Sequence, residues 1–290
     1  MDSKDIKDIV KDRYGKIAKQ GTSCCGPASS CCGNPDLVQI IGKEIGYSDK
    51  ELKAVPDGAN LGLGCGNPLA LSSIREGDTV LDLGSGAGFD CFLAAARVGK
   101  MGKVIGVDMT SEMIDKAREN AEKGHYENVE FRLGEIERLP VADGSVDLII
   151  SNCVINLSPD KAKVFQESFR ALKPGGRIMI SDIVLLKELP DFIKHSIEAY
   201  AGCVSGAIKK DEYLQNIREA GFHDVKVMDE SSFSAEFIIN DPAVKAIVQE
   251  SGIPPQEVEE IAGSVVSIKI AGIKPHARNY VGAEVAPGKG

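Results

Sequence analysis

The segment that most constrains the fold of this 290-residue chain is a short apolar run that leads directly into a glycine-rich turn. It reads Val80-Leu81-Asp82-Leu83-Gly84-Ser85-Gly86-Ala87-Gly88. The apolar residues suit a parallel strand that is covered on both faces, and the glycines let the backbone turn tightly and approach a ligand closely. A helix predicted over residues 89–98 would direct its free amide groups at that ligand. The segment therefore predicts a cofactor-binding loop.

The spacing of the glycines indicates which kind of cofactor the loop binds. A dinucleotide fingerprint needs a third glycine three positions after the second, where this chain has Phe89. The chain instead has Asp82 followed by Gly84, Gly86 and Gly88. This pattern resembles the first motif of the class I S-adenosylmethionine-dependent methyltransferases, in which the loop surrounds the amino acid end of the cofactor. A nicotinamide enzyme and an α/β fold without a cofactor are the alternatives.

A second acidic residue follows at the place expected for a ribose ligand. The strand predicted at 103–107 ends before Asp108, whose carboxylate can accept hydrogen bonds from two ribose hydroxyls. Ligands of open α/β sheets lie beyond the carboxyl ends of the strands, and Glu135, after the third strand, is expected to border the adenine. The predicted cofactor-binding residues are Asp82, Gly84, Ser85, Gly86, Gly88, Asp108, Met109, Glu135, Ile136 and Asn152.

Strands and helices alternate regularly through the centre of the chain. Strands are predicted at 79–83, 103–107, 128–133, 146–151 and 176–182, and helices at 89–98, 111–123 and 159–172. This alternation predicts an α/β protein with a doubly wound, mostly parallel, Rossmann-like sheet. After a helix opened by Pro190 come a helix at 211–220, strands at 224–229 and 264–273, and a helical insertion at 242–262.

We expect the chain to divide into three parts. Residues 1–70 would hold an N-terminal helix and a cysteine-rich arm, 71–187 the cofactor-binding domain, and 188–290 a helical region with a smaller C-terminal α+β part. The first helix carries apolar residues at helical spacing, which suits a lid over the cofactor site or the core. These apolar residues are Ile6, Ile9, Val10, Tyr14 and Ile17.

Charge and hydropathy narrow the choice of partners. The chain has 34 basic and 43 acidic residues, a net charge of -9, which disfavours nucleic acid as the substrate and favours a small molecule. The N-terminal residues are too charged for a signal peptide, and no apolar run approaches the roughly 20 residues of a membrane helix. We therefore expect a cytoplasmic protein with no membrane partner.

Eight cysteines suggest metal binding or redox chemistry, because a reducing compartment disfavours a disulfide framework. Cys65 and Cys203 each lie in a glycine-flanked loop, and Cys153 follows the fourth predicted strand, although a lone cysteine often serves only as a small apolar side chain. Cys91 lies within a helix beside apolar residues, where a core position is expected. The remaining four, Cys24, Cys25, Cys31 and Cys32, lie in a glycine-rich arm that either captures a soft ion or carries them incidentally.

Several segments together resemble one methyltransferase family, the arsenite methyltransferases, which transfer methyl groups from S-adenosylmethionine to trivalent arsenic. The segments are Gly64-Cys65-Gly66, Asp82 to Gly88, Val107-Asp108-Met109-Thr110, Ser151-Asn152-Cys153-Val154-Ile155-Asn156-Leu157 and Gly202-Cys203. The resemblance implies that Cys65, Cys153 and Cys203 hold the arsenic as catalytic residues and that an N-terminal cysteine, among Cys24, Cys25, Cys31 and Cys32, assists. Leu63 departs from the pattern, since an aromatic residue often precedes the Gly-Cys-Gly segment.

The chemistry of arsenic agrees with this resemblance. Trivalent arsenic is a soft centre with three bonding valences and one lone pair, so three thiolates can hold it while the lone pair attacks a sulfonium methyl group. No general base is required, and the protein contributes mainly by positioning. The resemblance also implies an external thiol reductant, such as a thioredoxin or a glutathione-type thiol.

Two other functions are compatible with parts of the sequence. A methyltransferase for a quinone or another small organic acceptor would share the cofactor loop and would make the cysteines incidental. A thiol-based protein that senses or sequesters metalloids without catalysis would share the cysteines. The complete cofactor motif at Asp82, Gly84, Gly86, Gly88 and Asp108 argues against the latter function.

Overall fold

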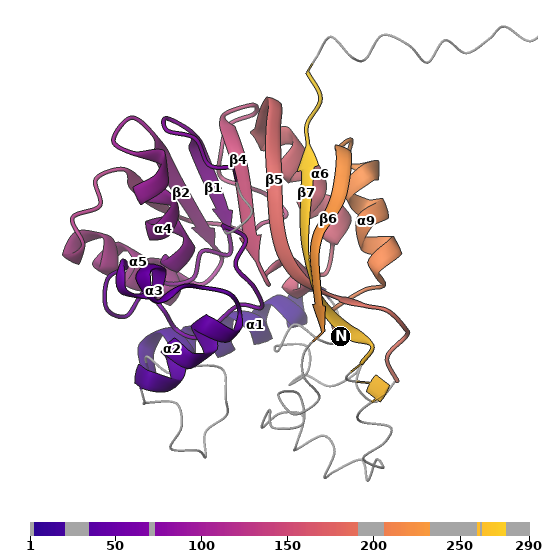
Figure 1. Cartoon of the computed structure of the whole chain (residues 1–290), viewed down its shortest axis with the longest axis horizontal. Coiled ribbons are helices and arrows are strands. Elements are labelled where there is room, and N and C mark those ends of the chain that lie inside the picture. Colours follow the sequence, from indigo (N-terminus) through magenta and orange to yellow (C-terminus); the bar gives the residue numbers. More distant parts are fainter. Residues whose placement is uncertain are drawn as a thin grey trace, which may run out of the picture.

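The protein is built around one seven-stranded sheet in the order β3-β2-β1-β4-β5-β7-β6 (Figure 1). The computed structural model describes residues 3–20, 35–69, 73–190, 206–232, 260–261 and 263–276. The strands are β1 (Thr79–Leu83), β2 (Lys103–Asp108), β3 (Val129–Leu133), β4 (Val146–Asn152), β5 (Leu172–Leu185), β6 (His223–Ser232) and β7 (Val265–Ile273). Strands β1 to β5 pair in parallel, whereas β7 pairs antiparallel with both β5 and β6.

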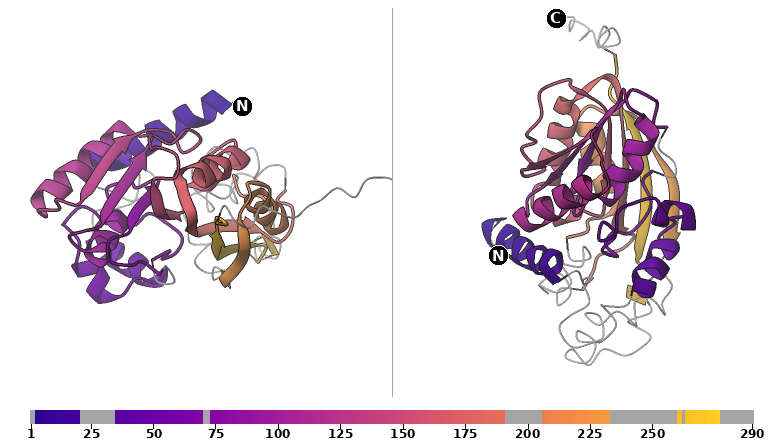
Figure 2. Two further views of the ribbon diagram at one scale, coloured as in Figure 1. Left: turned by 90° about the horizontal axis from the view of Figure 1, so that it is seen from above. Right: turned by 90° about the vertical axis from the view of Figure 1, so that its left-hand side faces the viewer.

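Helices cover both faces of this sheet. The described helices are α1 (Ser3–Gln20), α2 (Pro35–Glu44), α3 (Asp49–Lys53), α4 (Phe89–Val98), α5 (Ser111–Lys123), η1 (Ile155–Leu157), α6 (Lys161–Ala171) and α9 (Lys210–Glu219). Alternate residues of a strand serve the two faces: Leu81 packs in the apolar cluster that includes Phe165 of α6, and Val80 in the cluster that includes Phe92 of α4. Figure 2 shows the sheet enclosed between these two layers of helices. The predicted doubly wound, mostly parallel architecture is confirmed.

The predicted elements agree closely with those observed. The strand at 79–83 and the helices at 89–98 and 111–123 have the predicted bounds, and β5 extends the strand predicted at 176–182 to Leu172–Leu185. The helix predicted from Pro190 and most of the insertion predicted at 242–262 lie outside the described residues. Strand β7, from the predicted 188–290 part, pairs with β5, and β6 pairs with β7, so both strands extend the sheet of the central part. The division into three parts stays a prediction.

Helix α1 lies across the end of the sheet where the parallel strands finish (Figure 1). The predicted apolar stripe accounts for its position, because Val10 and Ile17 are buried while Asp12 and Lys16 between them are exposed. Val10 packs beside Cys65 and Cys153, and Ile17 packs beside Ala87 of the glycine loop. The N-terminal helix therefore covers the cysteines and the glycine loop together.

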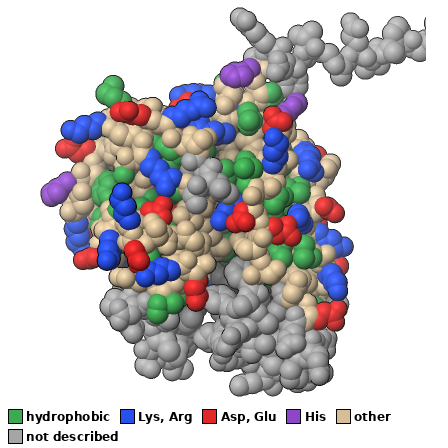
Figure 3. Space-filling view, in the orientation of Figure 1, with side chains coloured by type: hydrophobic (Ala, Val, Ile, Leu, Met, Phe, Trp, Pro, Cys, Tyr) green, Lys and Arg blue, Asp and Glu red, His purple; other side chains and the backbone are tan. Residues whose placement is uncertain are grey.

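The surface carries charges of both signs. On the face shown in Figure 3, basic and acidic side chains are interspersed over the described residues. Ion pairs between neighbouring elements use part of this charge, such as Lys269 of β7 with Asp229 of β6 at 2.9 Å. Within the described part of the chain, no helix has both the length and the apolar character needed to cross a bilayer.

Candidate active site

The glycine loop forms the turn between β1 and α4. Gly84, Gly86 and Gly88 have φ angles of 68°, 51° and 96°, a left-handed backbone that other residues rarely adopt. A Cβ atom at Gly84 would lie 2.3 Å from Val154, and one at Gly88 would lie 2.7 Å from the ring of Phe131, whereas one at Gly86 would meet nothing within 4 Å. Packing therefore requires glycine at the two outer positions, and the middle one faces open space.

Asp108 joins the end of β2 to this loop. Its Oδ2 accepts a hydrogen bond from the backbone N–H of Gly86 at 3.0 Å, and its Oδ1 accepts one from Thr110 N–H at 2.8 Å. Burial raises the pKa of Asp108, and these backbone donors oppose the effect. The Ser85 hydroxyl is buried and has no hydrogen-bond partner among the described residues. Polar groups thus line the loop on the side of β2.

Two acidic side chains lie buried beneath the loop. The Cys91 thiol donates to Asp82 Oδ2 at 3.2 Å, and burial raises the pKa of both groups well above their ordinary values. Cys91 is fully buried, so the predicted core position of this cysteine is confirmed. Asp90, in the first turn of α4, accepts a hydrogen bond from the Tyr47 hydroxyl at 2.6 Å, and burial raises its pKa to about 6.

Asn152, the last residue of β4, connects this acidic pair to a cysteine loop. Its Nδ2 donates to Gly66 O at 2.7 Å, to Tyr47 Oη at 3.0 Å and to Asp90 Oδ2 at 3.2 Å. Its Oδ1 accepts from Cys65 N–H at 3.1 Å. The side chain predicted to bind cofactor therefore contacts the backbone of the residues that carry Cys65.

Two of the three predicted central cysteines lie together at the carboxyl ends of β4 and β5. The Sγ atoms of Cys65 and Cys153 and a carboxylate oxygen of Asp182 all lie within 4.8 Å of one another. Neither thiol is in a disulfide. The exposed fractions are 7% for Cys65, 8% for Cys153 and 0% for Asp182, so the cluster is shielded from water.

Backbone contacts fix these two thiols. Cys153 has a left-handed backbone with φ of 58°, and its N–H donates to Ser181 O at 2.8 Å. The same carbonyl lies 3.8 Å from Cys65 Sγ, and the Ser267 hydroxyl donates to Cys65 O at 2.9 Å. A strained backbone at a non-glycine residue is typical of functional sites.

The remaining predicted site residues occupy different surroundings. Met109 packs against the cluster that contains Cys65 and Cys153, and Ile136 is buried in the core. Glu135 Oε2 forms an ion pair with Lys7 Nζ of α1 at 2.9 Å, a contact that lowers the pKa of this carboxyl group. Five predicted site cysteines, namely Cys24, Cys25, Cys31, Cys32 and Cys203, lie outside the described residues.

Three buried polar residues near the site were missed by the sequence analysis. Tyr47 and Asp90 hold Asn152, and Asp182 lies beside the two thiols. A signal existed for Asp182, because β5 is parallel to β4 and residues at the end of such a strand are candidates for ligand contact. No sequence signal marks Tyr47, which reaches Asn152 from a segment 105 residues away.

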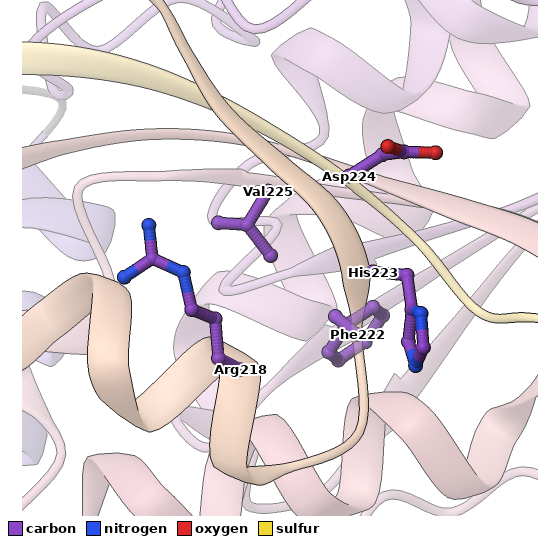
Figure 4. Close-up of a pocket in the computed structure, with 5 residues that line it drawn as sticks. All are labelled: Arg218, Phe222, His223, Asp224 and Val225. Atoms are coloured by element: carbon purple, nitrogen blue, oxygen red, sulfur yellow. The ribbon is translucent and has the colours of Figure 1, made fainter.

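A separate surface pocket lies at the other end of the strands, away from the cysteine cluster. It is lined by Arg218, Phe222, His223, Asp224 and Val225, at the turn from α9 into β6 (Figure 4). His223 pairs with Ile273, which also pairs with Arg177 near the amino end of β5, whereas Asp182 lies toward its carboxyl end. Because ligands of parallel sheets bind at the carboxyl ends, the cysteine cluster and the glycine loop form the candidate site.

Comparison with known proteins shows which family this chain belongs to. A family described as a methyltransferase domain matches residues 74–221. The chain is 50% identical to an arsenite methyltransferase of Halobacterium salinarum over 82% of this chain and 62% of that protein. It is 36% identical to one of Aquipseudomonas alcaligenes over 79% of this chain and 65% of that protein. The chain thus spans less than two thirds of the length of these curated relatives.

A solved structure shares both the fold and part of the sequence. The crystal structure of an arsenic (III) S-adenosylmethionine methyltransferase from Chlamydomonas reinhardtii matches with a TM-score of 0.58 and 31% identity, over 82% of this chain and 73% of that one. Its match extends beyond the segment covered by the family match. The chain described here therefore belongs to the methyltransferase domain family and has the fold of the class I S-adenosylmethionine-dependent methyltransferases.

Proposed function

We propose that this chain transfers methyl groups from S-adenosylmethionine to trivalent arsenic held by cysteine thiolates. One observation carries the proposal: Cys65 and Cys153, from segments 88 residues apart, place their sulfur atoms within 4.8 Å of each other at the end of the sheet that carries the cofactor loop. Two neighbouring thiols suit a soft, thiophilic centre. The relatives named as arsenite methyltransferases support the same substrate.

The loop residues fit S-adenosylmethionine. The open space over Gly86, the buried Ser85 hydroxyl and the Asp108 carboxylate form a polar cradle beside a glycine turn. We infer that Asp108 would hold the ribose hydroxyls and that Gly84, Ser85, Gly86 and Gly88 would surround the amino acid end. When bound, S-adenosylmethionine supplies an electrophilic methyl group on a sulfonium.

The protein's own part in the reaction is to bind arsenic and exclude water. The cluster of Cys65, Cys153 and Asp182 lies at the carboxyl ends of central strands, and α1 covers it through Val10. Because water is excluded there, exchange of thiolates with arsenic is favoured over hydrolysis of the arsenic–thiolate adduct. Binding of arsenic by thiolates releases the thiol protons, so affinity falls at low pH. The lone pair of the trivalent centre is left free for methylation, which needs no general base.

Cys203 is proposed as the third thiolate. Leu189 precedes and Ala207 follows Cys203 in the chain, and both are buried described residues. Both pack in the apolar cluster that contains Cys65 and Cys153. Ala207 follows Cys203 by four residues, a separation that the backbone spans with at most about 14 Å. The chain connectivity therefore allows this thiol to reach the other two. An N-terminal cysteine could deliver the arsenic to these three.

Methylation at the lone pair raises arsenic from the trivalent to the pentavalent state, so an external thiol reductant is proposed to return it to the trivalent state with formation of a disulfide. The decisive experiment incubates the protein with arsenite, a thiol and S-adenosylmethionine labelled in the methyl group, and then separates the products. The expected result is labelled methylarsenic species, absent when Cys153→Ser replaces the wild type. Transfer of label that does not require arsenite would contradict the proposal.

A further inference from the structure

The third side chain of the cysteine cluster is a carboxylate in an unusual setting. Asp182 is fully buried, and its Oδ1 accepts hydrogen bonds from Ile183 N–H and Asn156 Nδ2, both at 2.9 Å. Its Oδ2 accepts one from the Tyr213 hydroxyl at 2.9 Å. A carboxylate oxygen can accept two hydrogen bonds, so the one contact of Oδ2 leaves it with capacity for a second. The side chain is therefore oriented and still has capacity for a ligand.

All three hydrogen-bond donors to Asp182 are uncharged, while burial raises the pKa of this carboxyl group to about 6 and the charge of Lys161 acts in the opposite direction. Buried carboxylates are normally paired with a cation or bound to a metal ion. Carboxylates that bind metal ions are held in turn by outer hydrogen bonds of this kind. The ring of neutral donors around Asp182 thus matches the support expected for a metal ligand.

The donor set distinguishes between soft ions. Two thiolate sulfurs and one carboxylate oxygen suit zinc, which binds cysteine and aspartate together, and its heavier congener cadmium. Trivalent arsenic needs thiolates and gains nothing from a carboxylate. We propose that Cys65, Cys153 and Asp182 form a binding site for a thiophilic divalent cation, Zn²⁺ or Cd²⁺.

Occupation of this site involves no redox step. Two thiols lose their protons to solvent, two sulfur–metal bonds and one oxygen–metal bond form, and water leaves the ion. The proposed binding of the cation depends only on the positions of Cys65, Cys153 and Asp182. Its consequence, that Zn²⁺ competes with arsenite for the same two thiolates, rests on the proposed function. The cation would then act as a reversible inhibitor that a chelator removes.

The test uses the full chain with Cys24, Cys25, Cys31 and Cys32 replaced by serine, so that these four thiols cannot bind the ion, under a phosphine reductant. Titration calorimetry with Zn²⁺ is expected to give one site per chain. Asp182→Asn should weaken Zn²⁺ binding by about tenfold or more while arsenite binding changes by less than about twofold. Cys153→Ser should abolish Zn²⁺ binding, and the matched variant Cys91→Ser should retain it.

A second measurement does not depend on the folding of the Asp182 variant. Cadmium NMR on the protein without that substitution reports the donor set, because the chemical shift is lower for a mixed sulfur–oxygen site than for thiolates alone. A thiolate-only shift, the absence of Zn²⁺ binding, or equal Zn²⁺ affinity of a folded Asp182→Asn protein would each overturn the site. Labelled methyl transfer to arsenite, assayed without Zn²⁺, tests the proposed function separately.

Discussion

The carboxamide of Asn152 holds the backbone around Cys65 from two sides: its oxygen accepts from Cys65 N–H at 3.1 Å, and its nitrogen donates to Gly66 O at 2.7 Å. The same nitrogen contacts Asp90 of the helix that follows the cofactor loop. Cys153 is the next residue along the chain, so the side chain of Asn152 connects the segments of both thiols to α4. This arrangement makes Asn152 a positioning residue of the proposed reaction.

Asn152→Ala is expected to lower kcat/KM for arsenite by about a hundredfold, since displacement of a reacting group by about 1 Å has this effect. The matched control is Asn128→Ala, which removes two hydrogen bonds that Asn128 Nδ2 donates, to Ala95 O of α4 and to Gly99 O directly after this helix. Both variants lose stability, measured by denaturant unfolding. Only the first should lose turnover; equal activity losses would reduce Asn152 to a purely structural role.

The glycines of the loop should respond differently to substitution. Gly84→Ala adds a Cβ atom 2.3 Å from Val154 in a left-handed backbone, so it should destabilise the fold by about 1–3 kcal/mol beyond the backbone cost. Gly86→Ala has only the backbone cost of about 1–2 kcal/mol, but its methyl group enters the open space proposed for the cofactor. Calorimetry should show weaker S-adenosylmethionine binding in Gly86→Ala. Undiminished affinity would remove this loop from the cofactor site.

The position of α1 should depend on Lys7. Its Nζ lies 2.9 Å from Glu135 and 3.1 Å from Glu137, and it is 19% exposed, so the pairs are partly shielded. Lys7→Ala should weaken docking of α1 by about 1 kcal/mol and accelerate hydrogen exchange within the helix. Lys16→Ala serves as the control, because Lys16 pairs with Asp12 on the same helix. Similar exchange rates in the two variants would show that the apolar stripe alone holds α1.

Burial of Asp90 gives the stability a definite pH dependence. Desolvation raises its pKa from 3.8 to about 6, so the folded state binds the proton more tightly than the unfolded state. This contribution is complete below about pH 4 and is lost as the pH rises through 6. Urea unfolding across this range should show that the free energy of unfolding falls less steeply with rising pH in Asp90→Asn than in the wild type. Glu130→Gln should change the slope of stability with pH only between about pH 4.5 and 2, because Arg132 and Lys103 lower the pKa of Glu130 from 4.5 to about 2 and its contribution is lost as the pH falls through that window.

Counting the valences of arsenic separates the methylation steps of the proposed function. Arsenite offers three positions to thiolates, whereas a monomethylated trivalent arsenic offers two. Cys65→Ser should therefore lose methylation of arsenite and keep methylation of the monomethylated substrate, while Cys153→Ser and Cys203→Ser lose both. Single-turnover transfer of labelled methyl groups with each substrate measures this difference. Full arsenite turnover by Cys65→Ser would refute a site of three thiolates.

The sequence by itself determined the alternating strands and helices of the mostly parallel sheet and the glycine turn after its first strand, and it led to two thiols that lie together in the fold. Hydrophobic runs and glycines are local signals, since the strand at 79–83 needs apolar residues and the turn at Gly84 needs a left-handed backbone. The rule that ligands of parallel sheets lie at the carboxyl ends of the strands also makes Cys153 a candidate for the site, and its role there stays a prediction. The predictions of strands, helices and turns held because each depends on a few adjacent residues.

Only the tertiary structure decided how the site is held together. Tyr47 and Asp90 carry no local motif, and Asp182 is marked only by its place near the end of a parallel strand. Each acts through contacts with residues distant in the chain, such as Tyr47 with Asn152 and Asp182 with Tyr213. Cofactor binding by Asn152 stays a prediction, and the folded structure adds that its side chain contacts the Cys65 backbone. Buried polar side chains must find partners wherever packing supplies them. That choice depends on the folded arrangement of whole strands and helices, which no single stretch of sequence specifies.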